Sequence, residues 1–134
     1  MKIWGVDSMS EEVRDDLKYT TEHEWVRVKD HVARVGITDH AQHELTDIVF
    51  AELPEVGKDV KKGEELCVVE SVKSVSEIYA PVSGKVVKIN DALDDAPETI
   101  NASPYDDGWL VELEINNPDE VAQLLDAAGY KKLF

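Results

Sequence analysis

The stretch ESVKSVSEIYAPVSG, residues 70–84, decides the fold and contains the most informative residue of the chain, Lys73. Two apolar runs, residues 66–69 and 78–82, flank this lysine and predict a pair of strands joined by a tight turn. A charged residue at the tip of such a turn meets solvent and any modifying enzyme, while the strands keep its backbone rigid. The arrangement is typical of the attachment point of a carrier.

Alternating apolar and polar residues predict further strands. Ala33, Val35 and Ile37 share one face, and Val87 and Ile89 face away from the lysine between them. The clearest case is WLVELEI, residues 109–115, in which Trp109 and every second residue after it would face the core. Its two glutamates would face water, as in a half-buried antiparallel strand.

Helix signals occur in two places. In NPDEVAQLLDAAG, residues 117–129, Asn117 can cap a helix, Pro118 suits its first position and Gly129 its end. A shorter helix is expected to start at Thr38 and to carry HAQHEL before the strand DIVFAEL. Because glycine turns separate short strands in the middle of the chain, we expect a closed β-sandwich.

Composition sets independent limits. With 134 residues, of which 43% are hydrophobic, the chain fits one domain with a sizeable core. Its 29 acidic and 14 basic residues give a formal charge of −15, which repels nucleic acid and anionic membranes. This acidity serves solubility or steers the protein toward basic patches on partner enzymes, and composition leaves both explanations open.

The termini and the cysteine complete the domain description. We expect residues 1–18 to form an N-terminal extension, of which 1–8 precede a natural start at Met9, and residues 19–134 to form the domain. The N-terminus is too acidic for a secretory or transit peptide, so we expect a bacterial, cytoplasmic protein. The single Cys67 lies in an apolar strand and is expected to be a buried core thiol.

Four strings extend the pattern around Lys73 over most of the chain. They are EHEWVRV at 22–28, VGITDHAQHELTDIVFAELPEVG at 35–57, the stretch at 70–84, and NASPYDDGWLVELEI at 101–115. Through these strings the chain resembles the H protein of the glycine cleavage system. The resemblance implies a mainly β fold, a barrel-sandwich hybrid of two antiparallel sheets with peripheral helices, including one at the C-terminus.

The resemblance also assigns site residues. Lys73 aligns with the position that carries lipoic acid in amide linkage, which would convert the lysine into a swinging arm. Glu70 and Gly84 stand where the family places residues used by the lipoate-attaching enzyme. Glu24 and Glu77 match positions that line the cleft holding the loaded arm, although each could equally be an ordinary solvated charge.

The implied function is that of a shuttle. Such a carrier takes the aminomethyl group from glycine decarboxylase, the P protein, to the tetrahydrofolate-dependent aminomethyltransferase, the T protein. Dihydrolipoyl dehydrogenase, the L protein, then reoxidises the lipoyl group. The sequence contains neither G-x-S-x-G nor G-x-G-x-x-G, so we do not expect an independent enzyme. The resemblance also implies a monomer.

Two other functions remain open, and metal binding is not expected. The protein could relay lipoyl groups to other enzymes, or it could be a β-rich interaction module whose Lys73 stays unmodified. A biotin carrier would need methionines beside the lysine, where Val72 and Ser74 stand. His40 and His43 could share a helix face, but a zinc site needs further ligands, so we assign no metal.

Overall fold

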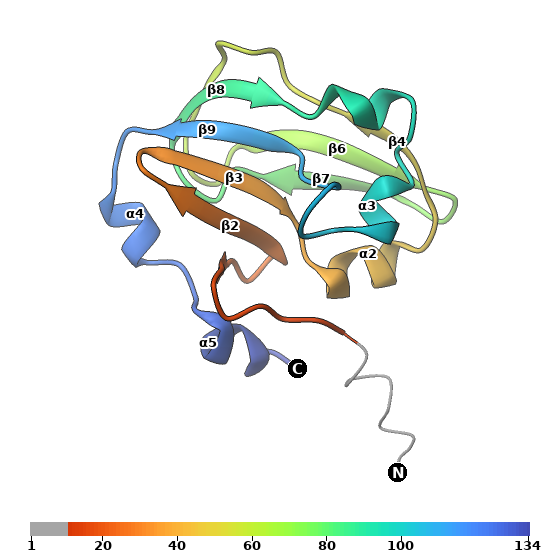
Figure 1. Cartoon of the computed structure of the whole chain (residues 1–134), viewed down its shortest axis with the longest axis horizontal. Coiled ribbons are helices and arrows are strands. Elements are labelled where there is room, and N and C mark those ends of the chain that lie inside the picture. Colours follow the sequence, from red (N-terminus) through yellow and green to blue (C-terminus); the bar gives the residue numbers. More distant parts are fainter. Residues whose placement is uncertain (1–10) are drawn as a thin grey trace.

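The computed structural model describes residues 11–134, in which strands predominate (Figure 1). In this part of the chain, nine strands form two antiparallel sheets. The larger sheet has the order β1 (Lys18–Tyr19), β2 (Glu24–Lys29), β3 (Val32–Ile37), β9 (Val111–Ile115), β8 (Gly84–Ile89) and β5 (Asp59–Val60). The smaller sheet has the order β4 (Ile48–Glu52), β6 (Glu65–Ser71) and β7 (Val75–Tyr79).

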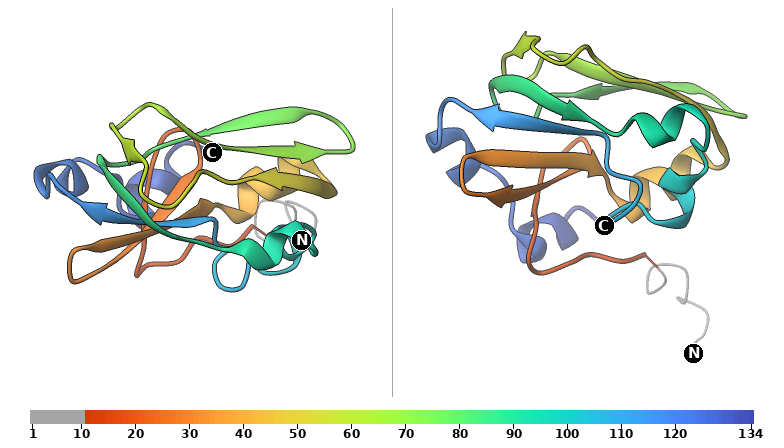
Figure 2. Two further views of the ribbon diagram at one scale, coloured as in Figure 1. Left: turned by 90° about the horizontal axis from the view of Figure 1, so that it is seen from above. Right: turned by 45° about the horizontal axis from the view of Figure 1, so that its top comes forward.

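Short helices lie around these sheets. They are α2 (Asp39–Leu45), the 3-10 helix η1 (Asp91–Asp94), α3 (Thr99–Ala102), α4 (Asp119–Ala122) and α5 (Ala127–Lys131). The views of Figure 2 place α4 at the opposite end of the molecule from α2 and α3. Within residues 11–134, a helix with the length and hydrophobicity of a bilayer span does not occur.

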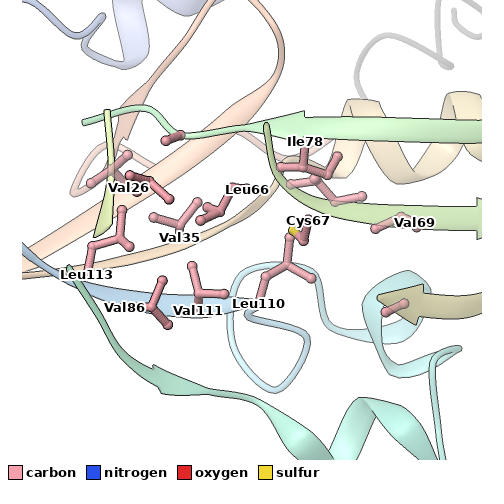
Figure 3. Packing of buried hydrophobic residues seen from close by; sticks show 14 of the residues in the cluster. Val26, Val35, Leu66, Cys67, Val69, Ile78, Val86, Leu110, Val111 and Leu113 are labelled. Atoms are coloured by element: carbon pink, nitrogen blue, oxygen red, sulfur yellow. The ribbon is translucent and has the colours of Figure 1, made fainter. Parts of the chain in front are cut away.

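One apolar core joins the two sheets (Figure 3). Val35, Val111 and Leu113 point inward from the larger sheet, and Val69 and Ile78 meet them from the smaller one. Burial of such side chains contributes about 1.5–3 kcal/mol each. The predicted architecture of two antiparallel sheets with peripheral helices is confirmed, and in the described residues the sheets stay separate in their hydrogen bonding.

Three local predictions are confirmed: the buried face of β3, the helix cap at Thr38 and the buried thiol of Cys67. Ala33, Val35 and Ile37 are buried on one face of β3. The side chain of Thr38 caps α2 by accepting a hydrogen bond from the backbone N–H of Ala41 at 3.2 Å. Cys67 is a buried free thiol, and burial raises its pKa.

Three strand predictions were wrong in detail. Val86 is the core residue in place of Val87, and a bulge between Val86 and Lys88 leaves two successive residues, Val87 and Lys88, exposed. The strand β9 begins only at Val111, so Leu110 enters the main core, while Trp109 packs against a second cluster. The second hairpin strand is β7, which starts and ends earlier than the predicted run at 78–82.

A C-terminal helix is confirmed, but the prediction of one continuous helix over residues 117–129 was wrong, because the chain divides it. The backbone N–H groups of Leu125 and Tyr19 each donate to the other residue's carbonyl oxygen at 2.8 Å, as in a short antiparallel bridge. Asp126 then starts a new helix, its carboxylate accepting from the N–H of Gly129 at 2.8 Å. The result is two short helices, α4 and α5, in place of one.

A second, smaller cluster holds this C-terminal segment. It contains Leu17, Tyr19, Trp25, Tyr105, Ala127 and Tyr130. The rings of Tyr19 and Tyr130 stack with centroids 4.5 Å apart. Part of the predicted N-terminal extension packs here, since Leu17 is buried, whereas the expectations for residues 1–8 lie outside the described residues. The proposed domain boundary at residues 18 and 19 stays a prediction.

The close approach of β8 and β9 generates a prediction about Gly84. A Cβ atom at this position would overlap the backbone carbonyl oxygen of Glu114, which cannot move without disturbing the sheet. We expect Gly84→Ala to lower the free energy of unfolding by about 1–3 kcal/mol, as measured by urea denaturation. At Gly57, an added methyl group meets no atom within 4 Å and only the positive φ of 100° opposes it.

Gly57→Ala therefore serves as the control and should cost only roughly 1 kcal/mol. A loss in Gly84→Ala no larger than that in Gly57→Ala would show that the sheet accommodates the added Cβ atom, and it would contradict the prediction.

Candidate functional site

The turn that carries Lys73 is held by a network centred on Ser71. The backbone N–H of Ser71 donates to the carbonyl oxygen of Ser74 at 2.8 Å. Its hydroxyl oxygen accepts from the N–H groups of Lys73 and Ser74 at 3.1 and 3.0 Å. The N–H of Val72 donates to the carbonyl oxygen of Asp47 at 3.0 Å, which ties the turn to the start of β4. The lysine side chain is thus exposed on a fixed backbone.

Sequence analysis did not single out Ser71, although a serine two residues before the lysine is a recognisable signal. Serine hydroxyls commonly accept hydrogen bonds from backbone N–H groups two and three residues later and so stabilise turns. The identity of this residue therefore explains the fixed geometry of the tip.

Lys73 lies across the C-terminal end of α2. Its ammonium group donates to the backbone carbonyl oxygen of Glu44 at 3.1 Å. The last carbonyl groups of a helix carry partial negative charge, so a cation is favoured there. This contact brings the lysine side chain to the rim of a cleft between α2, β7 and the turn that precedes β2.

The cleft has a volume of about 290 Å³. Ala41 and Leu45, which are partly exposed, supply apolar surface, and Glu22, Glu44 and Glu77 supply three carboxylates. The remaining lining residues are His23, Ile37, His40, Ser76 and Ile78. An amine on a flexible stem could therefore lie on apolar surface and meet negative charge.

The structure separates the two glutamates expected in the cleft. Glu77 lines it from β7 and is exposed. The neighbouring carboxyl of Glu77 raises the pKa of the Glu65 carboxyl. Glu24 is only 2% exposed and lies outside the cleft lining. Its position differs because β2 carries it into the domain.

Buried Glu24 is bonded on both carboxylate oxygens. One accepts from the hydroxyl of Thr20 at 2.6 Å, and the other accepts from the backbone N–H of Tyr79 at 3.4 Å. Burial raises the pKa of this carboxyl, and the two hydrogen bonds offset only part of the effect. Glu24 therefore ties the turn before β2 to the end of β7, which supplies one wall of the cleft.

Two histidines of the cleft, His23 and His40, are not identified as cleft residues by the sequence, in which His40 is only a candidate metal ligand. The rings of His23 and His40 lie 4.6 Å apart between centroids. His23 has a positive φ of 69° and its Nδ1 shares a 2.7 Å hydrogen bond with the hydroxyl of Tyr130. Burial, followed by the neighbouring His40, lowers the pKa of His23. Within residues 11–134, no group of three metal-ligating side chains assembles.

The two residues expected to guide the lipoate-attaching enzyme lie apart. Glu70 is on β6, directly before the turn, and pairs with Phe50 on one side and Val75 on the other. Gly84 is buried at the start of β8 in the larger sheet. The whole of β7 lies between it and the lysine turn along the chain. Glu70 therefore lies beside the turn that carries Lys73, whereas Gly84 lies in the other sheet.

Residues 17–134, which include the whole hairpin and the cleft, match the family model described as "Glycine cleavage H-protein". The chain belongs to the glycine cleavage H-protein family. A relative named "Glycine cleavage system H protein" from Anaeromyxobacter sp. (strain K) is 56% identical over 120 residues, which cover 90% of this chain and 94% of the relative. A protein of the same name from Myxococcus xanthus is 51% identical over 126 residues, 94% of this chain and 98% of that one.

A solved structure agrees with this assignment to the H-protein family. The crystal structure of a glycine cleavage system H protein from Mycobacterium marinum superposes with a TM-score of 0.83 at 41% sequence identity. The match covers 90% of this chain and 97% of that one. The fold and the family expected from the four sequence strings are both confirmed.

The buried carboxyl of Glu24 generates a pH prediction. Because the folded state raises its pKa, the native protein holds this proton more tightly than the unfolded chain does. The contribution of Glu24 to the free energy of unfolding is therefore greatest below the ordinary pKa of 4.5. It falls as the pH rises from 4.5 through the raised pKa of the folded state. Glu24→Gln removes the titration, so we expect the variant to gain stability relative to wild type as the pH rises.

Urea denaturation between pH 4 and 8 measures this difference. The matched control is Glu55→Gln, a change at an exposed glutamate. The prediction is contradicted if the difference in free energy of unfolding between wild type and Glu24→Gln stays constant from pH 4 to pH 8.

Proposed function

We propose that this protein is the lipoyl carrier of the glycine cleavage system, with lipoic acid joined through an amide to Nζ of Lys73. The observation that carries the proposal is the exposed amine on a rigid turn at the rim of an acidic cleft. Membership of the glycine cleavage H-protein family supports the same conclusion.

The residues around Lys73 fit an acyl group on its amine. The side chain is exposed, and its contact with the carbonyl oxygen of Glu44 is a single surface hydrogen bond that acylation can replace. The partly exposed side chains of Ala41 and Leu45 in the adjacent cleft can contact a hydrocarbon chain. When bound, lipoic acid supplies a strained cyclic disulfide that is open to thiol exchange.

The role that follows is a shuttle without its own catalytic residues. The protein would receive the aminomethyl group at glycine decarboxylase and deliver it to the tetrahydrofolate-dependent aminomethyltransferase, with dihydrolipoyl dehydrogenase restoring the disulfide. These partners, a monomeric state and a cytoplasmic location are parts of the proposal. Family membership and the bacterial relatives support them.

In the cleft, the carboxylates would hold the cationic amine of the cargo. Glu77 is exposed beside the path of the arm, and Glu22 and Glu44 face the same space. The role proposed for Glu24 is indirect, because its carboxylate is buried and bonded to Thr20 and Tyr79. It positions the wall of the cleft that ends in β7.

The carrier role is tested at Lys73. Wild type incubated with a lipoate ligase, lipoate and ATP should gain one lipoyl mass by intact mass spectrometry, and Lys73→Ala and Lys73→Arg should gain none. The loaded wild type should then support glycine decarboxylation by the P protein. If wild type is not modified by a ligase that is active on another acceptor, the proposal that this protein is a lipoyl carrier is refuted.

Modification without support of decarboxylation would instead favour a lipoyl relay. Lys73→Arg is the informative control because it keeps the positive charge over the end of α2 and so leaves the turn intact.

The holding role is tested at Glu77. We expect Glu77→Gln to release ammonia from the aminomethyl-loaded protein several-fold faster, because a charge-assisted hydrogen bond becomes a neutral one. The measurement is ammonia release over time in the absence of the T protein. Glu55→Gln removes an exposed charge outside the cleft lining and should leave the rate unchanged. An equal rate in all three proteins would exclude Glu77 from this role.

A further inference from the structure

The segment before β1 places a carboxylate against one wall of the cleft. The two carboxylate oxygens of Glu11 lie 3.0 and 3.1 Å from Nδ1 of His40, which lines the cleft from α2. The side chains of Glu11 and His40 are only 19% and 21% exposed. A second contact of Glu11, with Nδ1 of His43, is longer at 3.6 Å, and His43 is 59% exposed. Glu11 is therefore paired mainly with His40.

Hydrogen bonds of the next residues fix the position of this carboxylate. The backbone N–H of Glu12 donates to the carboxylate of Asp39 at 2.7 Å, and the carbonyl oxygen of Glu12 accepts from the hydroxyl of Tyr105. The guanidinium group of Arg14 donates to both carboxylate oxygens of Asp106 at 3.1 and 3.0 Å. Because Asp39 is the first residue of α2, the segment is tied to the same helical turn that carries the imidazole.

Two rings hold the imidazole of His40 in place. The ring centroids of His23 and of Phe134 each lie 4.6 Å from that of His40. Close packing of this kind opposes the ring rotation that would exchange the nitrogens of His40 with its carbons. The orientation of Nδ1 toward Glu11 is therefore supported by packing as well as by the hydrogen bond.

The chemistry of the pair decides which nitrogen of His40 carries the proton. An ionised carboxylate can only accept a hydrogen bond, so Nδ1 of His40 must be the N–H that donates to Glu11. In the neutral ring the other nitrogen, Nε2, is then an acceptor with a free lone pair. A neutral imidazole side chain without such a partner favours the opposite tautomer, with its proton on Nε2. Glu11 thus converts a histidine of the cleft into a hydrogen-bond acceptor.

We propose that Glu11 is a positioning residue that holds His40 in this tautomer, and that Nε2 of His40 accepts a hydrogen bond from the cationic amine of the cargo. The inference rests on the proposed function, because the cargo reaches the cleft only on a lipoyl arm at Lys73. Glu11 itself would not touch the cargo, since its carboxylate lies on the Nδ1 side of the imidazole and outside the cleft lining.

A neutral acceptor suits the half-buried wall of the cleft. The carboxylates of Glu22, Glu44 and Glu77 belong to exposed residues, where water reduces the cost of their charge. A carboxylate in place of His40 would lose much of this water, as Glu24 does, whose pKa burial raises. An imidazole nitrogen accepts a hydrogen bond there without burying a charge. The three N–H groups of an ammonium can therefore be shared between the exposed carboxylates and Nε2 of His40.

The positioning role is tested by comparing Glu11→Ala with Glu12→Ala. Glu12 is the matched control, because its carboxylate contacts Arg14 at 2.9 Å and lies outside the cleft lining. The measurement is heteronuclear NMR of the imidazole nitrogens in the protein without lipoate, at about pH 8.5, above the ordinary pKa of an imidazole. His40→Phe identifies the signals of His40. We expect the proton of His40 on Nδ1 in wild type and Glu12→Ala, and on Nε2 in Glu11→Ala.

The cargo contact is tested by ammonia release from the aminomethyl-loaded protein in the absence of the T protein. We expect Glu11→Ala and His40→Phe to release ammonia about three- to tenfold faster than wild type, the range expected for the loss of one hydrogen bond. His40→Phe keeps a ring between His23 and Phe134 and removes only the nitrogens. Glu12→Ala should release ammonia at the wild-type rate.

Several results would overturn the inference. A proton on Nε2 of His40 in wild type, or one that stays on Nδ1 in Glu11→Ala, would refute the positioning role. A change of tautomer that leaves ammonia release at the wild-type rate would show that His40 does not hold the cargo. Equal acceleration in Glu12→Ala would assign the effect to loosening of the whole segment. Failure of wild type to accept a lipoyl group would refute the proposed function, and this outcome is distinguishable because the tautomer is measured without lipoate.

Discussion

The apolar layer shared by the two sheets is the constraint on which the rest of the molecule depends. Because the smaller sheet contributes Val69 and Ile78 to this layer, its inner face is fixed against the larger sheet. Its outer face and the end of its hairpin are then free to carry exposed side chains. The lysine tip can be rigid and accessible at once since burial on one side of the strands fixes the backbone for both sides.

The second cluster extends this support to the cleft. Stacking of Tyr130 on Tyr19 places the tyrosine hydroxyl 2.7 Å from Nδ1 of His23 and 2.8 Å from the hydroxyl of Thr38. Thr38 caps α2, whose end receives Lys73. The C-terminal segment therefore positions both walls of the cleft from behind, although it supplies none of the lining carboxylates.

Charge is distributed differently in the interior and at the surface. Glu24 is buried, and its two hydrogen bonds compensate only part of the desolvation that raises its pKa. The carboxylates of Glu22, Glu44 and Glu77 stay hydrated on the rim, where the approach of a cation requires little desolvation. The buried carboxyl of Glu24 thus positions backbone segments, while the exposed carboxylates are available to a ligand. Both contribute to a formal charge of −15.

Sequence alone determined the features that depend on neighbouring residues. Lys73 between two apolar runs, Thr38 before a helix and Cys67 within a strand are each specified by a few adjacent positions, and the four family strings identified the architecture. Only the tertiary structure decided that Leu125 pairs with Tyr19 and divides the C-terminal helix. It also decided that a bulge in β8 leaves both Val87 and Lys88 exposed, and that Glu24 is buried outside the cleft lining. These outcomes depend on contacts between segments far apart in the chain, where packing and backbone hydrogen bonds outweigh local spacing.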